Sequence, residues 1–167
     1  MSTAAAAGAG VAVVAGALAR SRRRARQGLA GPVGRRLAVW VPPAPRSAVG
    51  KIAVRVWAAP MTLAGLLAGA GTGHLPKVRD GVVMFAPAEG ITGWVLRRRG
   101  FSAAGLGHVV ISLEQPPPPL LVHELTHVRQ AERLGPFMAP AYLALLAVHG
   151  YARHPMEQAA RLAAATA

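Results

Sequence analysis

Two histidines of this chain are spaced so that they can bind one metal ion together. They belong to the pattern His123-Glu124-Leu125-Thr126-His127. On a helix, residues four apart lie one turn from each other on the same face, so both imidazoles can bind one Zn²⁺. Glu124 then points beside them toward a water on the metal, where a carboxylate can act as general base. The chemistry that this pattern predicts is zinc-dependent hydrolysis.

A catalytic zinc normally has three protein ligands and a water, so a third ligand must come from elsewhere in the chain. The sequence has no cysteine, which leaves histidines and carboxylates as donors. The downstream candidates are His149, His154 and Glu157. Glu157 follows Pro155 at the start of an expected last helix, where a glutamate can also simply cap the helix or interact with its dipole. The residue types alone leave the choice open.

Catalysis also needs a hydrogen-bond donor for the oxyanion that develops on the substrate carbonyl. The segment after the motif offers Tyr142, His149, Tyr151 and His154. We expect Tyr151 to take this role, with the other three as alternatives. A lone aromatic residue beside a helix is, however, more often a packing residue than a catalytic one.

A second motif lies some tens of residues after the first, at Glu157-Gln158-Ala159-Ala160. His-Glu-x-x-His followed by Glu-x-x-Ala resembles the gluzincin branch of the zincin metallopeptidases. The resemblance implies that His123, His127 and Glu157 bind zinc, that Glu124 is the general base, and that the substrate is a peptide or protein.

The same downstream segment also resembles small, membrane-associated bacterial zincin-like proteins, through the residues Gly135-Pro136, Tyr142, Tyr151 and His154-Pro155-Met156-Glu157. Two departures from the family pattern matter. Many gluzincins continue Glu-x-x-Ala with an Asp that orients a zinc-bound imidazole, but this chain has Arg161 there. His154 stands where the pattern tends to have Asn, and it offers a competing nitrogen donor. We favour Glu157 over His154 as third ligand.

The motif requires a helix, and the flanking residues predict one over Pro119–Leu134. Four prolines precede the motif, and Gly135-Pro136 follows it as a stop signal. Leu121, Leu125 and Val128 recur at helical spacing and should face the core, which leaves His123, His127 and Gln130 on an adjoining stripe. A last helix should begin near Pro155.

Three stretches before the motif helix have strand character: Gly81–Phe85, Ile91–Arg98 and Leu106–Leu113. The segment at residues 86–90 reads as the turn between the first two. We expect Leu106–Leu113 to be the edge strand beside the motif helix, able to pair with an extended substrate. His108 lies outside any metal-ligand spacing and is expected to be a surface or packing residue.

The fold class that these elements predict is α+β: a small zincin-like domain with a short antiparallel sheet, the motif helix and two further helices. An apolar helical segment should precede it, because Val56–Gly73 is uncharged and has Lys or Arg on both sides. This segment is either a membrane-associated helix or a buried, Gly-rich helix or re-entrant hairpin packed on the catalytic domain. The expected divisions are residues 1–48, a low-complexity extension; 49–76, the apolar segment; and 77–167, the catalytic domain.

The formal charge is +13, and seven of the 17 arginines fall between Arg20 and Arg36. No aromatic residue interleaves this block before Trp40, and no nucleic-acid-binding motif accompanies it, so we expect no nucleic-acid partner. The Ala/Gly/Val run at residues 3–19 has its positive charges after the apolar part, which is the wrong order for a cleavable signal peptide. The expected localisation is at a membrane or in the cytoplasm.

The function predicted from these observations is zinc-dependent hydrolysis of peptide bonds. Two alternatives remain: a non-catalytic zinc-binding scaffold, and a basic adaptor acting through Arg20 to Arg36 at a membrane surface or on nucleic acid. Glu124 distinguishes the first alternative, because a structural zinc site has no use for a general base beside its ligands.

Overall fold

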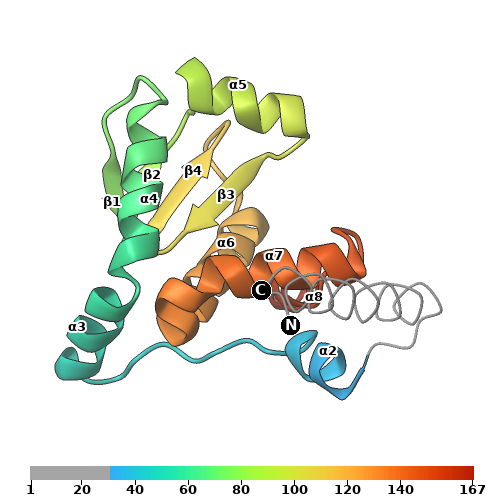
Figure 1. Cartoon of the computed structure of the whole chain (residues 1–167). Coiled ribbons are helices and arrows are strands. Elements are labelled where there is room, and N and C mark those ends of the chain that lie inside the picture. Colours follow the sequence, from blue (N-terminus) through green and yellow to red (C-terminus); the bar gives the residue numbers. More distant parts are fainter. Residues whose placement is uncertain (1–30) are drawn as a thin grey trace, which may run out of the picture. The chain divides into compact units, whose positions relative to one another are not determined.

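The computed structural model describes residues 31–167 (Figure 1). The fold is α+β, as expected, with a four-stranded sheet and helices. The described residues form two compact units. One comprises Val41–Ala139 and Ala159–Ala167, and the other comprises residues 31–40 and Pro140–Gln158. The residue run 3–19 and the arginines up to Arg26 lie outside the described residues, and the domain boundaries expected from the sequence stay a prediction.

The sheet belongs to the first unit and has the order β1-β2-β4-β3. Its strands are β1 (Lys77–Arg79), β2 (Val82–Phe85), β3 (Ala103–Leu106) and β4 (Val109–Ser112). The pairs β1–β2 and β3–β4 are antiparallel, but β2 and β4 run parallel. The expectation of an antiparallel sheet is therefore wrong at its centre, and the sheet is mixed.

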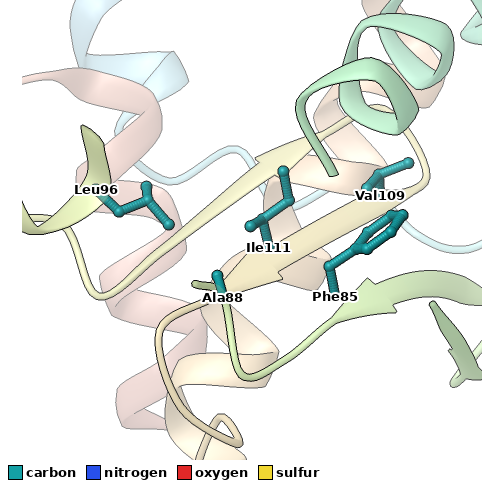
Figure 2. Packing of buried hydrophobic residues seen from close by; sticks show 5 residues of the cluster. All are labelled: Phe85, Ala88, Leu96, Val109 and Ile111. Carbon is teal, nitrogen blue, oxygen red and sulfur yellow. The ribbon is translucent and has the colours of Figure 1, made fainter. Parts of the chain in front are cut away.

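One face of the sheet packs against helices α4 (Ala59–Ala70) and α5 (Gly90–Arg99). The core on this face contains five fully or nearly buried side chains, labelled in Figure 2: Phe85, Ala88, Leu96, Val109 and Ile111. Leu66 and Ala68 of α4 pack against this cluster. Successive side chains of a strand point to opposite faces, so Val109 and Ile111 of β4 both point toward α4 and α5.

The other face of the sheet packs against α6 (Pro118–Leu134). Val110, the residue of β4 that points away from α4, forms a second cluster with Val82 and with Val128 of α6. Leu125 packs on this cluster, as the periodicity of the motif segment predicts. The sheet of this unit thus lies between α4 with α5 on one side and the motif helix on the other (Figure 1).

Two of the strand predictions need correction. Residues 91–98 are not a strand but most of helix α5, which ends at Gly100 in a left-handed conformation (φ 71°). Its apolar residues recur at helical spacing, with Leu96 buried and Ile91 and Trp94 exposed. Leu106–Leu113 is not one strand, because Gly107 (φ 59°) and His108 turn the chain between β3 and β4. As a result β3, not β4, is the edge strand.

The helices after the sheet agree with the sequence. The motif helix α6 spans Pro118–Leu134, one residue more than predicted, and a short 3₁₀ helix follows at Gly135–Phe137. Then come α7 (Met138–His149) and α8 (Pro155–Ala165), which begins at the proline expected to start it. The second unit contains a further short helix, α2 (Pro32–Leu37), together with most of α7 and the first turn of α8.

The apolar segment is helical but bent. Helices α3 (Ala48–Trp57) and α4 meet at an angle of 67°. Gly65 and Gly69 put α4 so close to the sheet that added methyl groups would collide with Val109 and the Phe85 ring. Within residues 31–167 no single helix is long and apolar enough to cross a membrane, although the bent pair of α3 and α4 reaches that length and composition together.

Candidate metal centre

The motif lies in the middle of helix α6, whose ends are fixed by backbone-restricted residues. Pro117 is extended (ψ 157°) and Pro118 begins the helix, where its missing N–H costs no hydrogen bond. Gly135 (φ 54°) ends it, and Trp57 of α3 packs so closely there that a side chain at position 135 would clash with its ring. His127 and Glu124 are buried, and His123 is half-buried.

The two histidines of the motif direct the same ring nitrogen toward each other. Their Nε2 atoms are 3.2 Å apart, and the rings meet edge to face with centroids 4.9 Å apart. Two ligand nitrogens at 2.0–2.1 Å from a tetrahedral zinc are about 3.3–3.4 Å apart. The spacing of the two imidazoles therefore fits a shared Zn²⁺ without rearrangement.

Gln130 fixes the orientation of His127. The Nδ1 atom of His127 lies 2.9 Å from Oε1 of Gln130, and the glutamine side chain is fully buried. Because an amide oxygen only accepts hydrogen bonds, Nδ1 carries the proton and the lone pair of Nε2 is left for a metal. The sequence placed Gln130 on the histidine stripe but did not assign it this role. The signal for this role is its position three residues after His127, in a chain with Arg161 where the family that it resembles has Asp.

Glu124 lies between the motif helix and strand β3. Its side chain is 4% exposed, and a Cβ atom at Gly105 would lie 3.0 Å from its Oε2 atom and 3.4 Å from Cβ of His127. A methyl group at position 105 would press on the Glu124 carboxylate, so glycine permits this close approach of β3 to α6. Gly105 was not identified from the sequence.

A second cluster lies within the unit that contains Pro140–Gln158. The Tyr142 hydroxyl donates a hydrogen bond of 2.8 Å to Oε1 of Glu157, which holds this carboxylate in place. The buried His154 ring stacks on Tyr142 with centroids 4.0 Å apart, and its Nε2 atom lies 3.0 Å from the Tyr142 carbonyl oxygen. Since a carbonyl accepts, His154 donates from Nε2. His154 thus ties α7 to the start of α8.

The ligand positions named by the family resemblance are divided between the two units. His123 and His127 belong to the unit built on the sheet, where their Nε2 atoms face each other. Glu157 belongs to the unit that contains Pro140–Gln158, where its carboxylate accepts the hydrogen bond of Tyr142.

Tyr151 precedes α8 and is 44% exposed. Its role as oxyanion donor stays a prediction. His149 ends α7, and partial burial lowers its pKa below the usual value.

His108 is a packing residue, as expected. Its Nε2 atom lies 3.1 Å from Oε1 of Glu132, and its backbone N–H donates to the Thr62 hydroxyl at 3.1 Å. Arg129 donates to the same Glu132 oxygen at 2.7 Å. Burial alone would raise the pKa of Glu132, but the hydrogen bonds and charges of His108 and Arg129 outweigh it and hold this pKa below its usual value.

Comparison with protein-family models, curated proteins and solved structures gives no match for this chain, so its function has to be argued from the motif and the geometry.

Proposed function

We propose that the chain is a zinc-dependent metallopeptidase in which His123, His127 and Glu157 hold the ion. The observation that carries the proposal is the 3.2 Å separation of the two histidine Nε2 atoms on α6. Glu157 is proposed as the third ligand because the Glu-x-x-Ala motif implies it, and Tyr142 holds its carboxylate within its own unit. Two imidazoles and one carboxylate are a ligand set of catalytic zinc sites, whereas Ca²⁺ and Mg²⁺ prefer oxygen ligands throughout. The nitrogen pair therefore favours zinc.

The residues around the ion would have separate tasks. When bound, zinc would polarise the substrate carbonyl and make water a nucleophile near neutral pH. Glu124 would take a proton from the attacking water and later pass it to the leaving amine. Gln130 would leave the lone pair of His127 Nε2 available to a metal, and the Tyr142 hydroxyl restrains the carboxylate of Glu157. Tyr151 is our candidate for the oxyanion donor.

The substrate that fits this arrangement is an extended peptide. β3 is an edge strand, and Gly105 brings its backbone against Glu124. A peptide added to the outer edge of β3 would pair with it through main-chain hydrogen bonds, which selects for backbone conformation rather than for particular side chains. The scissile bond would thereby be presented next to the general base.

The competing function is a zinc site that only stabilises the fold. It predicts the same metal content but no dependence of any reaction on Glu124. Zinc content and peptide cleavage therefore have to be measured on the same preparations.

The first arm of the test is metal analysis of zinc-reconstituted protein. We expect about one Zn²⁺ per chain, lost in His127→Ala and strongly weakened in Glu157→Ala. His154→Ala is the control, because the ring packs on Tyr142 and is not one of the proposed ligands. It should keep its zinc while unfolding more easily. Zinc loss in His154→Ala but not in Glu157→Ala would transfer the third-ligand role to His154.

The second arm is cleavage of a broad peptide library. Glu124→Gln keeps the shape of the side chain but cannot take a proton, so the rate should fall about 10²-fold or more while zinc and folding persist. Glu114→Gln, the same change at an exposed position, should cleave like wild type. If zinc-loaded wild type cuts no peptide, or Glu124→Gln cuts equally well, the structural-zinc function replaces the peptidase.

A further inference from the structure

Three helices of the unit built on the sheet present large apolar side chains to the solvent. Leu67 of α4 is 78% exposed, and Ile91 and Trp94 of α5 are 71% and 59% exposed. We call the following six residues of α3, α4 and α5 the outer apolar face: Ile52, Val56, Leu63, Leu67, Ile91 and Trp94. Exposed apolar residues that gather on adjoining elements are a mark of interaction surfaces.

The outer apolar face is built from one stripe on each helix. Its members are one turn apart on α3, at positions 52 and 56, and again on α4, at positions 63 and 67. The end of α4 directly contacts the start of α5, where the Thr92 hydroxyl donates to the carbonyl of Ala68 at 2.6 Å. A Cβ atom at Gly71 would lie 2.9 Å from the Ile91 side chain. The apolar stripes of α4 and α5 therefore adjoin.

The core does not need this face. Leu66, Gly65 and Gly69 are the residues by which α4 packs on the sheet, and Leu96 has the same role in α5. The exposed residues lie on the remaining sides of the same helices, which are apolar on both the core side and the solvent side. The packing of the core explains why the core side of these helices is apolar, but not why the solvent side is.

Charge identifies the partner. The sequences of α3, α4 and α5 contain no Asp or Glu, whereas Lys51 and Arg55 lie beside the apolar stripe of α3 and Arg97–Arg99 end α5. Two copies of such a face would bring these cations together, which disfavours self-association. An anionic lipid surface can bind both the apolar side chains and the cations. The acyl region accommodates the apolar side chains, and the headgroups interact with Lys and Arg. Tryptophan is also typical of membrane interfaces.

We propose that the outer apolar face docks on an anionic lipid bilayer, with the helices lying in the interface rather than crossing it. The inference is independent of the proposed peptidase activity. Within this unit, α6 lies on the opposite face of the sheet from α4 and α5. Docking through the outer apolar face would therefore leave Glu124 and its contact with β3 on the side away from the lipid.

The test is sedimentation of the full chain with vesicles of phosphatidylcholine containing phosphatidylglycerol, followed by extraction in about 1 M salt. At that salt the Debye length is about 3 Å, so contacts made by exposed arginines alone are released. Wild type should stay bound, whereas Leu67→Glu and Trp94→Glu should each be extracted and bind about tenfold more weakly. Leu143→Glu, at an exposed leucine of α7, is the matched control and should bind like wild type.

Fluorescence gives a second readout that does not depend on charge reversal. The chain has three tryptophans, and insertion of Trp94 should shift the emission of wild type to the blue on vesicle addition. Trp94→Phe should bind similarly but lose most of that shift. Three outcomes would overturn the proposal: release of wild type by salt, equal binding by Leu67→Glu, or a wild-type dimer that Leu67→Glu dissociates without lipid. The last outcome would make the face an interface between two copies.

Discussion

In the proposed zinc site, the hydrogen bond between Gln130 and His127 would replace a missing carboxylate. Arg161 stands where the resembled family has an Asp that orients a zinc-bound histidine, so another group would have to orient it here. Gln130 supplies the acceptor from within the motif helix itself, one turn after His127. A neutral amide raises the basicity of the imidazole less than a carboxylate would. The orientation of the ring is kept, while its affinity for the ion is expected to be more moderate.

We predict that Gln130→Leu lowers zinc affinity about 10–100-fold, the range typical for loss of a group that orients a metal ligand. Leucine preserves the volume but leaves Nδ1 of His127 without its acceptor, so either ring nitrogen can carry the proton. Affinity can be measured by competition with a chelator, and folding by circular dichroism. Gln158→Leu, at an exposed glutamine of α8, is the control. Unchanged affinity in Gln130→Leu would mean that His127 is held by packing alone.

At the scale of elements, the site depends on how closely β3 approaches α6. Gly105 permits this approach, because a Cβ atom there would lie within 3.0 Å of the Glu124 carboxylate. The same position would be next to any peptide that pairs with the edge of β3. In the proposed peptidase, the contact between strand and helix would therefore affect both the general base and the substrate.

Gly105→Ala should reduce the rate of peptide cleavage about tenfold while zinc content stays near one per chain. The added methyl group displaces the Glu124 carboxylate by a few tenths of an ångström, and proton transfer is sensitive to such a displacement. Cleavage kinetics and metal analysis would be compared with Gly31→Ala, where a Cβ atom meets nothing within 4 Å. A normal rate in Gly105→Ala would show that Glu124 moves freely or is not the base.

Elements with strong local signals were predictable from the sequence, and elements defined by distant partners were not. Helix α6 is bounded by prolines and by Gly135, and α8 begins at Pro155, so the sequence predicts α6 to within one residue and the start of α8. The sequence predicts a strand over residues 91–98, but the structure has a helix there. The helix packs on the sheet through Leu96 and ends at Gly100.

The residues of the candidate metal site show the same difference between local signals and contacts made by distant residues. His123, Glu124 and His127 share one helix and could be identified from spacing alone. The hydrogen bond of Tyr142 to Glu157 and the approach of Gly105 to Glu124 join residues that are distant in sequence, so no local pattern reports them. The central place of β4 was missed for the same reason, because strand order depends on which strands pair after the chain has folded.

At the scale of the whole molecule, the buried ion pairs of Glu132 should make the free energy of unfolding depend on pH. His108 at the turn between β3 and β4 and Arg129 on α6 both contact this carboxylate, and they lower its pKa below its usual value of about 4.5. A carboxyl whose pKa is lower in the folded state stabilises the protein above the usual pKa. That contribution is lost as the pH falls through the folded-state pKa.

We therefore predict that Glu132→Gln lowers the free energy of unfolding by about 1–3 kcal/mol at pH 7, and that the difference from wild type shrinks below about pH 4. Urea unfolding at a series of pH values measures both quantities. Glu89→Gln, at an exposed glutamate paired with His74, should change little at either pH. A constant difference between Glu132→Gln and wild type down to low pH would assign the loss to packing rather than to charge.

The position of β4 has a further consequence for how the chain is made. β4 is the last strand in the sequence, yet it is the one that lies between β2 and β3. During synthesis, β2 and β3 have no common neighbour until Ser112 has left the ribosome, and the apolar side chains of Phe85 and Val82 stay uncovered until then. Such unpaired strands are prone to aggregate. We therefore expect a ribosome stalled before codon 112 to present a client for chaperones, whereas a few dozen codons later the sheet and the motif helix can close together.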